Sequence, residues 1–164
     1  MSMTNTQKTI LHNDMLARPE LSSMLATGDD IGLANFYNQL AAPDFIVWRP
    51  SVRKDEITAS PTFDWTRVDN LTVGKARIWD MLFDNASKSI VPSQANIRAG
   101  IDAAWVGTAA DLAVRASVYA MCKRKATLVE KLLAIGTGTD ATPATLGYEG
   151  PISYQDISEA RVWQ

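Results

Sequence analysis

The chain has 164 residues, 46% of them apolar and 21% charged, which is typical of a soluble globular protein long enough for one domain with its own core. Its apolar runs, such as Phe45–Trp48, are far shorter than the ~20 residues of a membrane-spanning helix, and the N-terminal residues lack the apolar core of a secretory signal. A single cysteine, Cys122, and a single histidine, His12, exclude an intrachain disulfide framework and zinc sites built from several such residues.

Charge is distributed in three blocks, although the net charge is −2. Residues 1–66 carry five Lys and Arg against eight Asp and Glu, residues 67–131 carry ten against six, and residues 132–164 carry one against four. This alternation argues against a broad nucleic-acid-binding surface, which needs a dominant basic field. It is compatible with copies of the chain that meet head to tail, and ordinary solvated faces are the alternative explanation.

Helical spacing and capping residues predict three helices before residue 42. Residues 5–17 place several apolar side chains near one helical face. Pro19 suits the first turn of a second short helix, which we expect to end at Gly28. Asp29 and Asp30 precede the third helix, residues 31–41, as an acidic N-terminus.

The segment that follows has the composition of an extended strand. Prolines bracket the β-branched and aromatic run Phe45–Trp48, so we expect it to lie over the core. A short helix over residues 52–58 follows, with Ser51 as its cap, and residues 63–65 are expected to form a tethered loop.

Residues 67–135 are predicted to form a helical body. The apolar spacing of residues 71–83 predicts one helix, in which Gly74 would permit a close helix crossing. A second helix ends at Gly107, and residues 108–135 are expected to form one long helix with a bend. Thr127 and Glu130 have capping-box spacing, which favours the alternative of two helices.

The C-terminal part, residues 136–164, departs from helical spacing. Gly136 is predicted to stop the preceding helix, and a threonine-rich connector then leads to a hairpin with Glu149-Gly150 at its turn. Ser153 has capping-box spacing for a short terminal helix. The predicted fold is therefore mainly α: a helical bundle with an extended segment in the N-terminal half (1–66), a body (67–135) and a C-terminal β-hairpin arm, in one domain.

The chain contains few side chains that could transfer a proton, act as a nucleophile or bind a metal. A nucleophilic Cys–His pair would need Cys122, which lies on a predicted core face, and a Ser–His–Asp triad would need His12. The adjacent carboxylates Asp29-Asp30 and Asp55-Glu56 lie at predicted helix starts, where the helix dipole favours negative charge. We therefore predict no catalytic residue, no cofactor and no metal.

Gly136-Thr-Gly138 resembles a phosphate-binding loop only superficially. No lysine follows a glycine there, the third glycine of a dinucleotide fingerprint is missing, and the pair follows the end of a helix, where carbonyl groups repel phosphate. A connector that reaches toward another subunit is the preferred interpretation.

Interface residues are the remaining candidates. Tryptophan is enriched at interface hot spots, and glycine, proline and aromatic residues of the C-terminal part mark the arm. The candidate subunit or partner contacts are Trp48, Trp65, Gly136, Gly138, Pro143, Tyr148, Glu149, Tyr154 and Trp163. Local packing is the alternative for the tryptophans. The basic cluster Lys123, Arg124 and Lys125 is a candidate phosphate or subunit contact, although on a helix its side chains would fan out.

Four stretches resemble a family of small proteins encoded in tailed-phage genomes and prophages. They are APDFIVWRPSV, VDNLTVGKARIWDML, NIRAGIDAAWVGTAADLAV and the C-terminal stretch from CKRKATLVEK to SEARVW, within residues 30–163. A helical body with a projecting arm is similar to head–tail adaptor proteins, which form rings under the portal, although fold-level likeness alone does not establish function.

The resemblance implies a structural virion protein without enzymatic activity, an adaptor or head-completion protein at the head–tail interface. The implied partners are other copies in a ring, the portal and other connector proteins, with incidental DNA contact and no membrane. Assembly would take place in the bacterial host cytoplasm. A capsid-associated or tail-completion protein is the alternative within virions. A small phage hydrolase using Asp29 or Asp55 and a DNA-binding regulator using Lys123–Lys125 are the alternatives from other classes.

Overall fold

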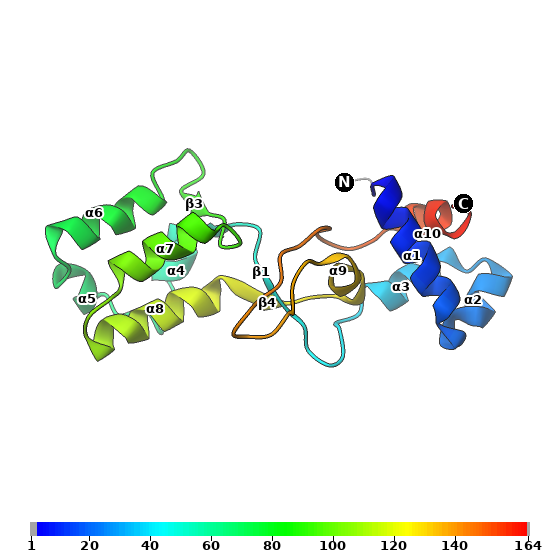
Figure 1. Cartoon of the computed structure of the whole chain (residues 1–164), viewed down its shortest axis with the longest axis horizontal. Coiled ribbons are helices and arrows are strands. Elements are labelled where there is room, and N and C mark those ends of the chain that lie inside the picture. Colours follow the sequence, from blue (N-terminus) through cyan, green and yellow to red (C-terminus); the bar gives the residue numbers. More distant parts are fainter. Residues whose placement is uncertain (1–2, 164) are drawn as a thin grey trace. The chain divides into compact units, whose positions relative to one another are not determined.

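A computed structural model describes residues 3–163 and confirms a mainly α fold. Its described residues form ten α-helices, one 3-10 helix and four short strands (Figure 1). The chain divides into two compact units. Unit 1 combines Met1–Val47 with Lys125–Gln164, and unit 2 is the continuous segment Trp48–Arg124. These limits do not coincide with the division predicted at residues 66 and 135, because the two ends of the chain share one core.

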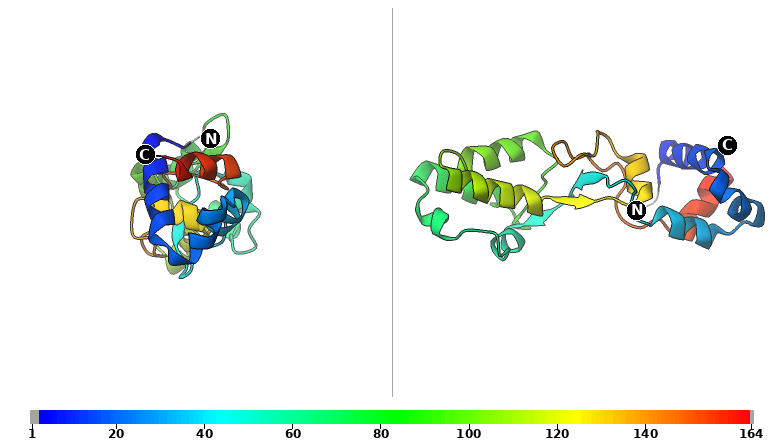
Figure 2. Two further views of the ribbon diagram at one scale, coloured as in Figure 1. Left: turned by 90° about the vertical axis from the view of Figure 1, so that its right-hand side faces the viewer. Right: turned by 90° about the horizontal axis from the view of Figure 1, so that it is seen from below.

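Unit 1 is a helical unit built from both ends of the chain. Its elements are α1 (Asn5–Ala17), η1 (Pro19–Leu21), α2 (Ser22–Thr27), α3 (Asp30–Tyr37), α9 (Leu128–Leu133) and α10 (Tyr154–Arg161). Helix α10 packs on α1 and on α3 (Figure 2). The buried core includes Leu11, Met15, Leu33, Tyr37, Val129, Leu133, Tyr148, Ile152 and Ile157.

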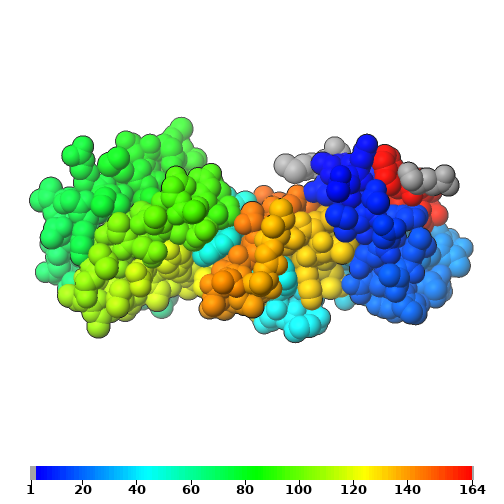
Figure 3. All heavy atoms as spheres, viewed as in Figure 1, coloured from blue at the N-terminus to red at the C-terminus, as the bar shows by residue number. Residues whose placement is uncertain are grey.

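Polar contacts also tie the two chain ends together. The His12 ring nitrogen Nδ1 lies 3.0 Å from the Ala160 carbonyl oxygen, and Trp163 Nε1 donates to Thr9 Oγ1 at 3.1 Å. Figure 3 shows the N-terminal atoms (blue) against the C-terminal atoms (red). The C-terminal part is therefore built into unit 1. The predicted projecting arm is wrong, because the apolar side chains of residues 148–160 are needed to cover α1 and α3.

The antiparallel pairing of the C-terminal part lies ten residues earlier than predicted. Ile135 and Thr145 form an antiparallel bridge, with N–O distances of 2.9 and 2.8 Å, so the turn encloses residues 136–144. The backbone at Glu149-Gly150 forms no strand pair. Ala144, the last residue of this turn, is fully buried and forms a parallel bridge with Val47.

Unit 2 packs five helices around an aromatic core. They are α4 (Lys54–Thr58), α5 (Thr66–Asp69), α6 (Val73–Leu82), α7 (Ala95–Ala104) and α8 (Ala109–Met121). Strands β2 (Val52–Arg53) and β3 (Ser89–Ile90) pair antiparallel, with Val52 opposite Ile90. Phe63, Trp79, Phe83 and Trp105 make ring contacts at centroid distances of 4.9–6.3 Å. One of these contacts is stacked and three are edge to face, and both geometries add to the favourable burial of the rings.

Helices α6 and α7 cross closely at Gly100. A Cβ atom at this position would lie 2.6 Å from Leu82 Cδ2, so the missing side chain admits Leu82. The sequence prediction assigned the close crossing to Gly74, but no atom lies within 4 Å of a Cβ placed there. The spacing of apolar residues identified the helix and could not identify which glycine faced its neighbour.

The chain passes between the units at strands β1 (Ile46–Trp48) and β4 (Lys123–Lys125), which are neighbours in a two-stranded sheet. Strand β1 confirms the predicted extended segment. Strand β4 corrects the prediction of one long helix over residues 108–135. Helix α8 ends at Met121, and the Thr127–Glu130 capping box starts α9 as a separate helix. Within residues 3–163, no helix is both long and apolar enough to cross a membrane.

Candidate interaction surface

The outer face of α6 carries a groove of about 700 Å³, which we call the α6 groove. Thr72 caps the helix by accepting a hydrogen bond from the Lys75 N–H group. Trp79 faces the core, whereas Val73 is 87% exposed and Met81 64% exposed. The two side chains line one groove together with Leu71 and Ala76, and a contiguous exposed apolar patch of this kind is typical of a protein-binding surface.

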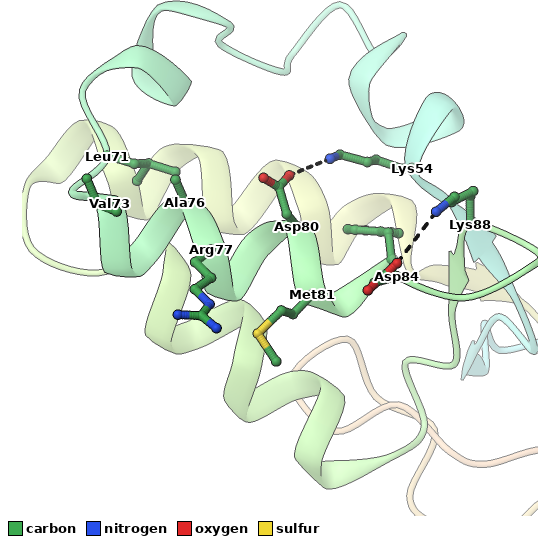
Figure 4. A pocket seen from close by; sticks show the side chains of 10 residues that line it. Lys54, Leu71, Val73, Ala76, Arg77, Asp80, Met81, Asp84 and Lys88 are labelled. Carbon is green, nitrogen blue, oxygen red and sulfur yellow. Dashed lines mark hydrogen bonds and ion pairs between the residues drawn. The ribbon is translucent and has the colours of Figure 1, made fainter.

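Charged side chains border this apolar surface (Figure 4). Lys54 Nζ lies 2.8 Å from Asp80 Oδ1, and Lys88 Nζ lies 3.8 Å from Asp84 Oδ1. Exposed ion pairs of this kind contribute only about 0–1 kcal/mol to stability. Their side chains can therefore pair with a binding partner instead at a small loss of stability. Arg77 also lines the groove, between Val73 and Met81 at helical spacing, and makes no ion pair or side-chain hydrogen bond within residues 3–163.

A second hollow of about 500 Å³ shares Lys54, Asp80 and Lys88 with the α6 groove. Its apolar lining includes Phe63 and Trp65, whose rings meet edge to face at 5.4 Å. Trp65 is 60% exposed. Of the three tryptophans predicted as contact residues, Trp65 is therefore the one with a surface available to another molecule.

A second exposed surface lies on unit 1 at the turn that precedes α10, Glu149–Tyr154. Glu149 and Pro151 are exposed, and Tyr154 is 54% exposed. The backbone beneath them is fixed, because the Gly150 N–H group donates to Glu130 Oε1 at 3.0 Å and Asn38 Oδ1 accepts from the Ile152 N–H group at 2.8 Å. The turn thus presents an acidic, an apolar and an aromatic side chain from a rigid frame.

The other candidate tryptophans pack locally. Trp48 is buried in unit 2, where its ring lies 6.0 Å from that of Tyr119 and under the guanidinium of Arg98. Trp163 is half-buried and lies under Lys8 Nζ at 5.0 Å. The alternative of local packing therefore explains both residues.

The glycines of the threonine-rich connector, Gly136 and Gly138, are part of unit 1. Gly136 has a φ of +125°, and Gly138 has a φ of +67° with the Phe45 ring against its Cα. Helix α9 ends at Leu133 with Ala134 as its cap, so Gly136 lies three residues beyond the helix. Pro143 is half-buried in the same loop, and Tyr148 is buried in the core. Of the predicted contact residues in the C-terminal part, Glu149 and Tyr154 have exposed side chains available to a partner.

The basic cluster lies on strand β4 rather than on a helix. Side chains alternate along a strand, so Lys123 and Lys125 point to one side and Arg124 to the other. Lys125 Nζ lies 2.7 Å from Asp44 Oδ2. Lys123 and Arg124 also have partners within the chain. The cluster does not form a row of unmatched cations.

The adjacent carboxylates have structural roles. Asp29 accepts from the Gly32 N–H group at 2.8 Å as the N-cap of α3, and Asp30 pairs with Arg161. On α4, hydrogen bonds from Arg53 lower the pKa of Asp55 and hydrogen bonds from Arg49 lower the pKa of Glu56. Lowered pKa values of this kind stabilise the charged form and disfavour a proton donor at neutral pH.

Cys122, the candidate nucleophile, is buried in the core of unit 2. Burial raises the pKa of the Cys122 thiol to about 12, so the thiolate form of this side chain is disfavoured. Among residues 3–163, no cluster of three or more His, Cys, Asp or Glu is arranged to hold a metal ion.

Comparisons with protein-family models, with curated proteins and with solved structures found no match to this chain.

Sequence reasoning did not find the α6 groove. It treated residues 71–83 as one apolar face, and Val73, Arg77 and Met81 were not singled out. Their spacing of four residues places them on one side of α6, whereas Trp79 and Leu82 lie on the other. This four-residue spacing indicates a second row of side chains, on the side of α6 opposite the core. The sequence alone does not show how exposed that row is.

Proposed function

We propose that the chain is a structural protein of a tailed-bacteriophage particle, an adaptor or head-completion protein at the head–tail interface that assembles as a ring on the portal. The observation that carries this proposal is the exposed apolar face of α6, with Val73 and Met81 on either side of the unmatched Arg77. A surface of this kind serves contact between proteins, and the resemblance of the sequence to a tailed-phage family supplies the setting.

The charges of the two units support association between copies. Unit 1 carries five Lys and Arg against ten Asp and Glu, a net charge of −5, whereas unit 2 carries eleven against eight, a net charge of +3. Opposite charges on two surfaces of one chain favour contacts in which unlike surfaces of two copies meet. Such heterologous contacts form a closed ring when the rotation between copies permits it.

The test is the location of the protein in intact particles. We expect the chain in purified virions, at the head–tail junction in subunit-resolved images, and in complex with portal when the two are co-expressed. A tail or capsid protein of the same phage that does not contact portal serves as the control for non-specific co-purification. Absence of the chain from purified virions contradicts the structural role altogether.

A further inference from the structure

Two unmatched charges of opposite sign lie on the two exposed surfaces. Within residues 48–124, every Lys and Arg other than Arg77 has an ion pair, a hydrogen bond or another electrostatic partner. Among the described residues of unit 1, every Asp and Glu other than Glu149 has such a partner. Each unit therefore has one charged group of its dominant sign that no other described side chain neutralises.

Apolar surface accompanies each of these charges. On α6, Arg77 is one helical turn from Val73 and from Met81, both of which are exposed. On the turn before α10, Glu149 is followed by the exposed Pro151 and Tyr154. An ion pair beside apolar contact is the common composition of a protein interface, because the apolar area supplies affinity and the charges fix register.

The backbone of the turn Glu149–Tyr154 is held in one conformation by hydrogen bonds within unit 1. Hydrogen bonds from Gly150 to Glu130 and between Asn38 and Ile152 hold its backbone, so little conformational freedom is lost when a partner orders it. The α6 groove lies on a helix packed along α7, which is an equally fixed surface. Both surfaces are preformed, which lowers the entropy lost when two copies associate.

We propose that the turn Glu149–Tyr154 of one copy docks in the α6 groove of a second copy, with Glu149 paired to Arg77 and Tyr154 packed against Met81. This inference rests on the proposed function, since it specifies the contact through which copies associate. The two surfaces differ, so each copy offers one of each and the contact continues from copy to copy. Unit 1 is the acidic partner and unit 2 the basic one, in agreement with their net charges.

The test is a charge exchange in the full-length chain. Arg77→Glu and Glu149→Arg are each expected to weaken self-association roughly tenfold, because each places like charges together at an interface. The double variant restores the pair in the opposite sense, and we expect its association to return to within about threefold of the original value. Sedimentation velocity over a range of protein concentrations, at one low and one high salt concentration, measures all four proteins.

Matched controls separate this pair from general charge effects. Arg115→Glu on α8 and Glu20→Arg on η1 change the net charge by the same amounts at partly exposed ion pairs outside both surfaces. They are expected to leave association nearly unchanged. Arg77 and Glu149 are exposed and make no ion pair or side-chain hydrogen bond within residues 3–163, so we expect their variants to fold, and far-UV circular dichroism is the check.

The outcomes distinguish this contact from the proposed function. If the chain self-associates and the single reversals do not weaken it, the contact is wrong and the ring proposal stands. If the single reversals weaken association and the double variant does not restore it, Glu149 and Arg77 do not meet and the contact is again wrong. A chain that stays monomeric at every concentration, alone and with portal, removes both proposals.

Discussion

Substitution of Gly138 by alanine tests how the C-terminal loop is held in unit 1. Gly138 combines a φ of +67° with a Cα that faces the Phe45 ring, and an added Cβ would lie 2.1–2.4 Å from three ring atoms. The positive φ costs a residue with a Cβ about 1–2 kcal/mol, and overpacking against a ring costs about 1–3 kcal/mol. Together they predict a loss of about 2–5 kcal/mol from the free energy of unfolding of unit 1.

Two further glycines separate these contributions. Gly150 has a φ of +90° with no atom within 4 Å of an added Cβ, so Gly150→Ala carries the backbone term alone, about 1–2 kcal/mol. Gly74 lies in α6 with open space around it and no positive φ, so Gly74→Ala is expected to stabilise its helix by up to about 1 kcal/mol. The expected order of stability is therefore Gly74→Ala, then the original chain, then Gly150→Ala, then Gly138→Ala.

Thermal unfolding measures this order. For a unit of this size, 2 kcal/mol lowers Tm by roughly 8–16 °C. Unit 2 contains Trp48, Trp65, Trp79 and Trp105, so tryptophan fluorescence follows mainly unit 2, whereas far-UV circular dichroism follows both units. We expect the Gly138→Ala shift in the dichroism signal. Equal stability of Gly138→Ala and Gly150→Ala would refute the reasoning about the Phe45 contact.

Three further predictions concern individual side chains. Hydrogen bonds from Arg67 lower the pKa of Asp111 to about 2, below its ordinary value of 3.8. Its carboxylate therefore stabilises the fold above pH 3.8 and loses this effect as the pH falls toward 2, so acid unfolding of Asp111→Asn should depend less on pH between these values. The buried Cys122 thiol should react with a disulfide reagent at least on the order of 100-fold more slowly in the folded chain than in urea, and equal rates would contradict its burial. Thr127→Ala removes the side-chain cap of α9 and should lower the free energy of unfolding by about 1 kcal/mol in urea titrations. Thr145→Ala, at an exposed position of unit 1 whose hydroxyl makes no hydrogen bond within residues 3–163, serves as its control.

Caps were the most informative local signals in the sequence. Thr127 and Ser153 each start a helix through a capping box, as their spacing predicts. The Thr127–Glu130 spacing predicts a break, whereas the alanine-rich composition of residues 108–135 favours one continuous helix. The break prevails because strand β4 pairs with β1, a contact between residues some 75 positions apart that helix propensity does not register.

Long-range contacts explain the remaining differences. Helix spacing predicted the elements of the first 41 residues, yet nothing in that spacing shows that α1 and α3 pack on α10. The apolar residues of the C-terminal part were assigned to a projecting hairpin because they alternate loosely. Tyr148, Ile152 and Ile157 instead fill the space between the N-terminal helices, where burial outweighs weak strand pairing. The α6 groove could not be predicted for a related reason. The exposure of Val73 and Met81 depends on how all the helices of unit 2 pack, which local spacing does not show.

The discontinuous construction of unit 1 sets the order in which the ribosome can complete the fold. Unit 2 has all its residues once Arg124 has emerged, whereas α1 and α3 wait for α9 and α10 before their apolar side chains are covered. During that interval the side chains of Leu11, Met15 and Tyr37 are exposed, so they can form non-native contacts or bind chaperones. The same dependence applies to proteolysis, because a cut that releases α10 strips the N-terminal helices of their cover. Helix α10, which is synthesised after the other helices of residues 3–163, therefore determines when the apolar face of α1 is covered.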